Sequence, residues 1–101
     1  MPVYVISEVW VRDPELFGKY REMARPTLGK YGGRYLVRGG AVETVEGEWV
    51  PGQLIIVEFP SMEKAREWYN SPEYVEARKV REHALDRNMI FVEGVPPGMN
   101  S

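Results

Sequence analysis

The sequence predicts an α+β domain whose elements follow in the order strand, helix, strand, strand, helix, strand. Three observations predict this order. Residues 3–11 and 53–59 alternate their side chains with the two-residue period of a strand. Asp13-Pro14-Glu15 supplies an N-cap, a proline at the first helical position and an acidic first turn, and Ser71-Pro72-Glu73 repeats this signal. The two halves of the chain therefore share one strand-helix-strand plan.

The first half contains a strand that is apolar on both faces and a long helix. Residues 3–11 carry Tyr4, Ile6 and Trp10 on one face and valines on the other. After Asp13, apolar side chains recur at helical spacing, at Leu16, Phe17, Tyr20, Met23, Ala24, Leu28 and Tyr31. Gly32-Gly33 then ends the predicted helix.

Residues 34–45 form a second predicted extended segment. Gly39-Gly40 interrupts it, and paired glycines in a strand pattern usually mark a bulge or sharp bend, so we expect the strand to curl there. Glu46-Gly47-Glu48 turns the chain. Residues 53–59 then form the third strand.

The second helix is predicted to be broken near Asn70. Ser61 can cap a short helix through Tyr69, and Ser71 opens the next helix. On a helical wheel, one arc of that helix contains Tyr74, Ala77, Arg81, Ala84 and Leu85, and the opposite arc contains Glu76, Lys79, Glu82, His83, Asp86 and Arg87. We expect the first arc to face protein and the second to face water. A guanidinium at Arg81 then needs a carboxylate, carbonyls or an anionic ligand, unless it reaches the rim.

The end of the chain contains a short strand and a tail. Residues 88–93 are the fourth predicted strand, and residues 96–101, which include Pro96-Pro97-Gly98, are a predicted tail. With 101 residues the chain is long enough for one core, so we predict a single domain over residues 1–95.

The element order is that of the ferredoxin-like split βαβ arrangement, an antiparallel four-stranded sheet with both helices on one face. The other face of such a sheet stays uncovered. Since the first strand is apolar on both faces, a monomer would leave a large apolar patch in water. The sequence therefore predicts a homodimer that packs sheet on sheet.

Composition argues against several function classes. With 13 basic and 15 acidic residues the net charge is -2, which predicts neither nucleic-acid nor membrane binding. The chain has no cysteine, as expected of a protein in the reducing cytoplasm, and therefore no thiolate ligand or nucleophile. Its one histidine, His83, is predicted to face solvent. We therefore predict no metal site and no cofactor.

A set of motifs resembles domain-of-unknown-function family 1330, small proteins of the dimeric α+β-barrel superfamily. The resemblance covers almost the whole chain and rests on Asp13-Pro14-Glu15, Gly32-Gly33-Arg34-Tyr35-Leu36, Arg38-Gly39-Gly40, Glu46-Gly47, Glu58-Phe59-Pro60-Ser61, Trp68-Tyr69-Asn70-Ser71-Pro72-Glu73-Tyr74 and Glu93-Gly94. It implies a ferredoxin-like subunit and a homodimer with a shared barrel. It implies no reaction, because the superfamily includes cofactor-free monooxygenases, haem-degrading enzymes, lactone isomerases and ligand-binding proteins.

The candidate site residues are polar or aromatic side chains that the predicted elements turn partly inward. Glu8 and Glu58 are the candidate proton acceptors on the first and third strands. The candidate ligand-binding residues are Arg81, Arg38, Tyr74, Trp68 and Tyr69. The same charges could instead form a structural ion pair that ties the last helix to the sheet.

Two function classes remain open. The first is a cofactor-free enzyme that acts on a small organic acid or aromatic compound, with Arg81 orienting the substrate and Glu8 or Glu58 taking a proton. The second is a non-catalytic homodimeric ligand-binding or scaffold domain. A cavity of about 300 Å³ or more beside Arg81 would favour the enzyme, and a filled core would favour the scaffold.

Overall fold

A computed structural model describes residues 1–96 and 98 of the chain. In this part the elements are β1 (Val3–Val11), α1 (Pro14–Lys30), β2 (Arg34–Arg38), β3 (Gln53–Phe59), α2 (Met62–Tyr69), α3 (Pro72–Ala84) and β4 (Leu85–Glu93). This order confirms the predicted one, including the break in the second helix. The predicted tail includes residues 97 and 99–101, which lie outside the described residues.

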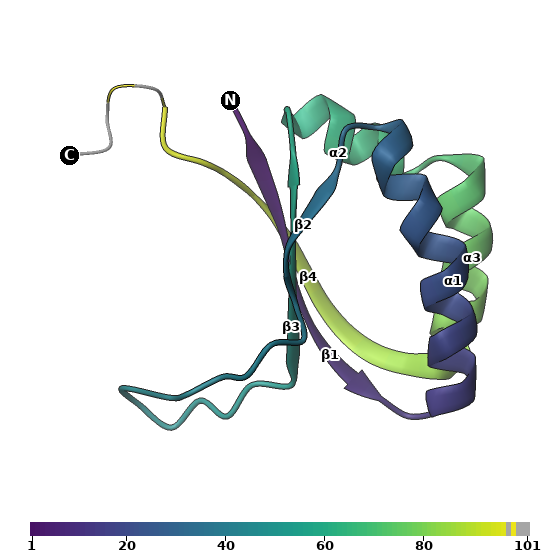
Figure 1. Cartoon of the computed structure of the whole chain (residues 1–101), viewed down its shortest axis with the longest axis vertical. Coiled ribbons are helices and arrows are strands. Elements are labelled where there is room, and N and C mark those ends of the chain that lie inside the picture. Colours follow the sequence, from purple (N-terminus) through teal and green to yellow (C-terminus); the bar gives the residue numbers. More distant parts are fainter. Residues whose placement is uncertain (97, 99–101) are drawn as a thin grey trace.

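The four strands form one antiparallel sheet in the order β2-β3-β1-β4, and the helices cover one of its faces (Figure 1). β1 lies in the middle, where Ile6 is opposite Ile56 of β3 and Ile90 of β4. The sheet and the helices on one face confirm the predicted ferredoxin-like fold. None of the described helices is long and apolar enough to cross a lipid bilayer.

The hydrophobic core lies between the helices and the covered face of the sheet. Its largest fully buried side chains are Tyr74, Phe59, Val3, Val5 and Val9. The three helices start at the predicted caps, because Asp13, Ser61 and Ser71 each accept a hydrogen bond from a backbone N–H of the first turn.

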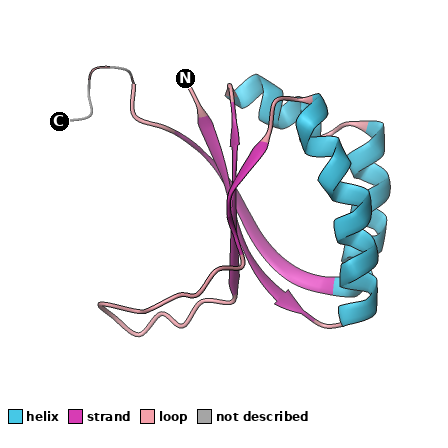
Figure 2. Ribbon diagram, viewed as in Figure 1, coloured by secondary structure: helices cyan, strands magenta, loops and turns pink. Residues whose placement is uncertain are grey.

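The second strand is shorter than predicted. β2 ends at Arg38, and the expected extension to Val45 is wrong, although the predicted bend occurs at Gly39, whose φ of 68° favours glycine. Residues 39–52, which we call the arm, form a loop that leaves the sheet on the side away from the helices (Figure 2). The side chain of Trp49 anchors the arm by donating to Glu8 Oε2 at 2.9 Å.

The junction between α3 and β4 also differs from the prediction. The helix ends at Ala84, whose carbonyl oxygen accepts hydrogen bonds from the backbone N–H groups of Arg12 and Asp13 at 2.9 and 3.0 Å. Leu85 is already extended, and β4 begins there without a loop, three residues before the predicted start. Arg87 therefore belongs to a strand, and its assignment to the water-facing arc of a helix is wrong.

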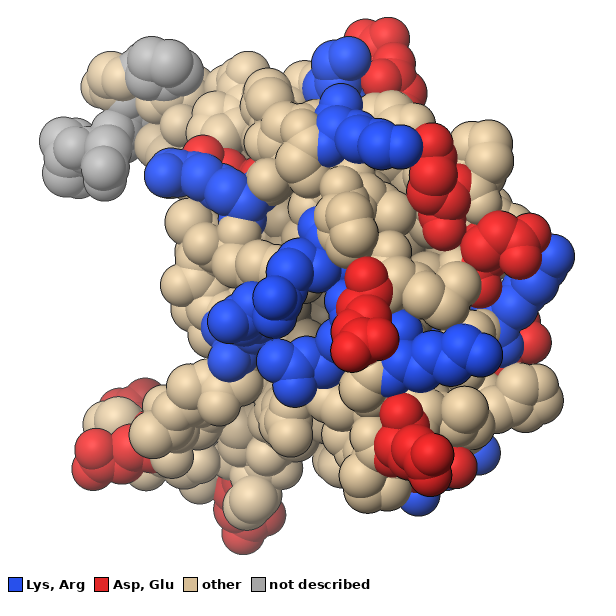
Figure 3. Space-filling model, turned by 45° about the vertical axis from the view of Figure 1, so that its right-hand side comes forward, with Lys and Arg blue, Asp and Glu red and all other residues tan. Residues whose placement is uncertain are grey.

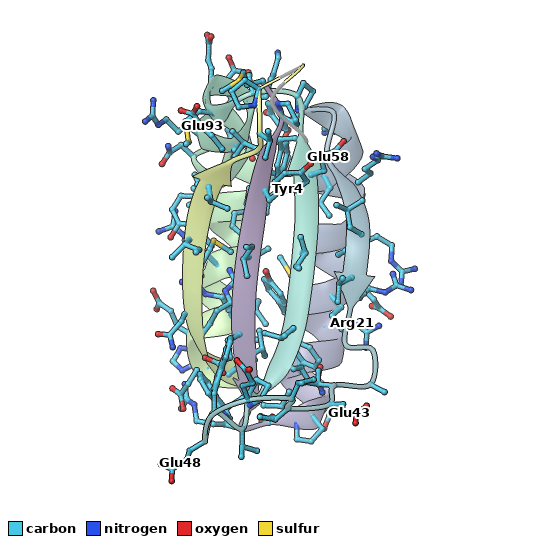
Figure 4. The ribbon with its side chains drawn as sticks, turned by 90° about the vertical axis from the view of Figure 1, so that its left-hand side faces the viewer. Tyr4, Arg21, Glu43, Glu48, Glu58 and Glu93 are labelled. Carbon is cyan, nitrogen blue, oxygen red and sulfur yellow. The ribbon has the colours of Figure 1, made fainter. Side chains whose placement is uncertain are left out.

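The sheet face away from the helices, which we call the open face, is largely apolar. Figure 4 looks onto this face and shows Tyr4 and Glu58 on it. Strand alternation and the register place Ile6, Ile56 and Ile90 side by side on the same face, and Ile90 is 58% exposed. The subunit therefore leaves a row of branched apolar side chains in water.

Candidate functional site

A cavity of about 220 Å³ lies between α1 and the covered face of the sheet. Its walls are mainly apolar, and they are formed by Val5, Phe17, Ala24, Leu28, Ile55, Val57, Trp68 and Met89. The polar residues that line it are Ser7, Tyr20, Arg21, Tyr35, Arg38, Gln53 and Arg87. No carboxylate or imidazole lines the cavity within the described part of the chain.

A hydrogen-bonded cluster of Arg87, Tyr20 and Tyr74 lies at one side of the cavity. Arg87 donates through Nη1 to Tyr20 Oη at 3.1 Å and through Nη2 to Tyr74 Oη. The two phenol oxygens are 2.7 Å apart and share one hydrogen bond. Arg87 Nε is buried and has no partner among the described residues.

The cluster combines a positive charge with neutral phenols. Burial raises the pKa of Tyr20, the neighbouring Tyr74 raises it further, and Arg87 only partly opposes this, so the Tyr20 phenol is protonated at neutral pH. Burial would lower the pKa of Arg87, but the two phenol oxygens more than offset this effect and the pKa is raised. Arg87 is therefore charged, and no described carboxylate forms an ion pair with it.

The cluster has more donors than acceptors. Two phenol hydrogens are present, and the bond between Tyr20 and Tyr74 uses only one of them. Both oxygens already accept a hydrogen bond from Arg87. One phenol hydrogen and the Nε hydrogen of Arg87 therefore have no acceptor among the described residues.

Three more arginines lie close enough to Tyr35 to act on its pKa, and two of them, Arg21 and Arg38, line the cavity. The guanidinium carbon of Arg38 lies 5.1 Å from the centre of the Tyr35 ring, and that of Arg21 lies 5.5 Å from the Phe17 ring. Burial raises the pKa of Tyr35, and Arg38, Arg25 and Arg21 act against that rise. None of the three forms an ion pair in the described part of the chain. Figure 3 shows Lys and Arg side chains gathered across the middle of one face of the molecule.

Three of the predicted site residues meet at this cavity. Arg38 and Trp68 line it, and Tyr74 lies behind its wall as part of the arginine-tyrosine cluster. The rings of Trp68 and Tyr74 pack against each other with centroids 4.1 Å apart. The indole Nε1 of Trp68 also donates to Thr27 Oγ1 at 2.9 Å, which fixes the ring beneath α1.

The two predicted proton acceptors lie on the open face, across the sheet from the cavity. Glu8 accepts hydrogen bonds from Trp49 Nε1 and, at 3.3 Å, from the backbone N–H of Gly52. Glu58 pairs with Arg34 at 3.1 Å. The structure therefore gives both carboxylates partners on the open face and does not bring either of them to the arginine-tyrosine cluster.

Arg81 and Tyr69 line a second feature, a groove of about 430 Å³ beside α3 and β4. Arg81 is half-buried and forms no ion pair with a described residue, so the structural ion pair that was one alternative for it is not seen in the described part of the chain. The groove has the expected volume, but its lining is mainly polar and includes the ion pair of Arg12 with Asp86 at 3.3 Å. His83 is exposed, as predicted.

The sequence reasoning missed Tyr20 and Arg87 as site residues. The signal for Arg87 was the alternation of Leu85, Arg87 and Met89 with Asp86, Asn88 and Ile90, which has the period of a strand. Among the described residues, no group of three His, Cys, Asp or Glu side chains could hold a metal ion.

Solved structures share this fold. Protein RPA0582 of unknown function from Rhodopseudomonas palustris is 24% identical, with a TM-score of 0.77 over 95% of this chain and 84% of that chain. SnoaB, a cofactor-independent oxygenase from Streptomyces nogalater, is 9% identical, with a TM-score of 0.64 over 95% of this chain and 97% of that chain. A dimeric protein of unknown function and ferredoxin-like fold from Bacteroides fragilis is 16% identical, with a TM-score of 0.54 over 92% and 96%.

The sequence comparison identifies a family. No curated protein matches the chain. The model of the family described as Domain of unknown function (DUF1330) matches residues 2–95, which include all the motifs on which the resemblance rests. The predicted resemblance is thus confirmed, and the chain belongs to the DUF1330 family.

Proposed function

We propose that this protein is a homodimer whose subunits each bind a small organic anion with an apolar or aromatic body in the cavity between α1 and the sheet, and act on it without a cofactor. One observation carries the proposal. Arg87 lines an apolar cavity with a half-buried side chain, and among the described residues its guanidinium has two neutral phenols as partners and no carboxylate.

Burying a charge without a counter-charge is costly, because the ion loses its hydration. A ligand carboxylate or other negatively charged oxygen in the cavity would supply the missing negative charge. The apolar walls favour a flat hydrocarbon body next to that oxygen. A cavity of about 220 Å³ restricts the ligand to a small molecule.

The same donors support an enzymatic role. Tyr74 is fully buried and does not line the cavity, so its hydroxyl hydrogen is best used in the bond to Tyr20, and the Tyr20 hydroxyl is then free to donate into the cavity. Together with Arg87 it would stabilise an oxygen that becomes negatively charged during a reaction, such as the oxygen of an enolate or phenolate. Because no carboxylate or imidazole among the described residues lines the cavity, the proton would leave to water.

Binding is tested by isothermal titration with 2-naphthoate and with the neutral 2-naphthalenemethanol as a matched control. The two probes share the aromatic body and differ in the charged group. We expect the carboxylate to bind at least about tenfold more tightly, the value of one charged hydrogen bond. Equal affinity for both probes, or no binding of either, would contradict the proposed anion site.

The alternative is a non-catalytic binding protein, and the lack of a proton acceptor in the described cavity lining favours it. Turnover of bound 2-naphthol separates the two functions, because the charge of Arg87 would lower the pKa of the bound naphthol in either case. An enzyme should convert the naphthol, whereas a binding protein should release it unchanged. SnoaB shares only the fold, but it makes oxygen consumption the first activity to assay.

The homodimer is proposed from the open face of the sheet. Exposed Ile90 and Val92 next to Ile6 and Ile56 form an apolar row that soluble monomers rarely expose. Packing this row against its copy about a two-fold axis would cover it. The dimeric protein from Bacteroides fragilis shows that this fold occurs in dimers. The absence of cysteine supports the cytoplasm as the proposed compartment.

A further inference from the structure

The arm is almost entirely exposed in the isolated subunit. Its side chains from Ala41 to Val50 are all exposed, and Val45 and Val50 are 87% and 84% exposed. Trp49 and Gly52 hold its base to Glu8, but most of its length projects away from the sheet (Figure 1). An arm that carries such exposed apolar side chains needs a surface to contact.

The arm is acidic. It contains Glu43, Glu46 and Glu48, and no lysine or arginine occurs from residue 39 to residue 63. Figure 3 shows acidic side chains at the lower left, on the part of the molecule that projects away from the body, apart from the basic group in the middle of that face. Figure 4 places Glu43 and Glu48 at one end of the sheet.

The complementary surface lies beside the cavity. Arg21 and Arg38 line the cavity, Arg25 lies one turn after Arg21 on α1, and none of the three forms an ion pair in the described part of the chain. The arm cannot easily cover the cavity of its own subunit, because it leaves the sheet on the open face while the cavity lies under the helices. A second copy of the chain can bring an arm to this surface.

The length of the arm is sufficient for this contact. Half of its 14 residues, extended at about 3.3 Å per residue, reach about 20 Å from the sheet. Two sheets that pack face to face lie only about 10 Å apart. The tip of an arm would therefore pass the partner's sheet and arrive at the level of the partner's cavity.

We propose that in the homodimer the arm of each subunit reaches the other subunit and covers its cavity, with Glu43, Glu46 and Glu48 facing Arg21, Arg25 and Arg38. This inference rests on the proposed homodimer through the open face. The partner then supplies carboxylates to an entrance that its own subunit lines with arginines. Two-fold symmetry makes the contact reciprocal, so both cavities are covered in the same way.

Cross-linking between subunits tests the proposal. Because the chain has no cysteine of its own, only the introduced cysteines can react. One protein carries Val45→Cys on the arm, and a second carries Gly18→Cys, which is exposed on α1 one and two turns before Arg21 and Arg25. The two proteins are mixed, allowed to exchange subunits and treated with a short bis-maleimide. We expect a covalent product of twice the 11.6 kDa mass of one chain. The matched control replaces Gly18→Cys with Lys79→Cys, exposed on α3, and should give no product.

A charge-reversal variant shows whether the glutamates guide the arm. Glu43→Lys, Glu46→Lys and Glu48→Lys in the Val45→Cys protein should largely abolish the product. Reversal of three glutamates on the helices, Glu63, Glu76 and Glu82, should leave it unchanged. If light scattering shows a dimer but no product forms with Gly18→Cys, the arm contact is wrong and the dimer stands; a monomer would refute both the dimer and the arm contact.

Discussion

Replacing Arg87 with methionine should remove anion binding while changing stability little. The substitution keeps an unbranched, flexible apolar stem and removes the guanidinium with its charge. The two hydrogen bonds to Tyr20 and Tyr74 that are lost would each contribute about 1.5–3 kcal/mol. The substitution also removes two penalties from the folded state. The unpaired Nε costs about 1–3 kcal/mol, and the partly buried charge costs several kcal/mol more. These terms nearly cancel, so the free energy of unfolding should change by less than about 2 kcal/mol.

Ligand affinity should respond very differently. A lost charged hydrogen bond to the ligand corresponds to a dissociation constant for 2-naphthoate that is about 10- to 150-fold larger. Urea denaturation measures stability, and isothermal titration measures affinity. Arg66→Met, exposed on α2 and away from the cavity, is the control for loss of one positive charge. The reasoning is refuted if Arg87→Met loses more than about 4 kcal/mol of stability with unchanged affinity, because Arg87 would then be structural.

Three further predictions concern the open face, the buried phenol and the arm. Ile90→Glu places a charge in the proposed interface, so light scattering should show the mass of a folded monomer, and an unchanged dimer would contradict this interface. Burial raises the pKa of Tyr20 above its ordinary value of 10.0, so its stabilising contribution is present below pH 10 and lost as pH rises above it. Tyr20→Phe should therefore lose stability less steeply than the parent between pH 9 and 11.5, as urea denaturation will show, and identical slopes would argue against a buried phenol. Glu8→Ala frees Trp49 and should speed cleavage of the arm by a glutamate-specific protease, whereas Glu58→Ala should not.

The elements with strong local signals were predictable from the sequence. Asp13, Ser61 and Ser71 cap the helices as predicted, because each places an acceptor oxygen beside the free N–H groups of a first turn. The alternation in β1 and β3 identified the central strands, and Tyr74 and Ala77 face the core as the helical wheel predicts. Trp68 and Arg38, two of the predicted ligand-binding residues, line the cavity, and their role in binding stays a prediction.

The errors fall where long-range pairing overrides local pattern. Residues 85–87 have no glycine or proline before them and fit a helix as well as a strand. The predicted helix was therefore extended past Ala84, where the helix ends in the structure. Pairing of Val9 with Arg87 and of Val11 with Leu85 draws this segment into the sheet, and that contact spans more than 70 residues. The helix ends between Arg81 and Arg87. As a result Arg87, which was predicted to face water, lines the cavity, and Arg81, which was predicted to face protein, does not.

The arginine at position 87 is better explained by ligand binding than by the stability of the fold. Leu85 and Met89 flank it on the covered face of β4, and an apolar residue there would fill the same space without the cost of burying a charge. The phenols of Tyr20 and Tyr74 do not require a cation, since they already bond to each other at 2.7 Å. A guanidinium at this position therefore adds something that packing does not need, a positive charge in the lining of an apolar cavity. A positive charge beside apolar walls is what a binding site for a small organic anion requires.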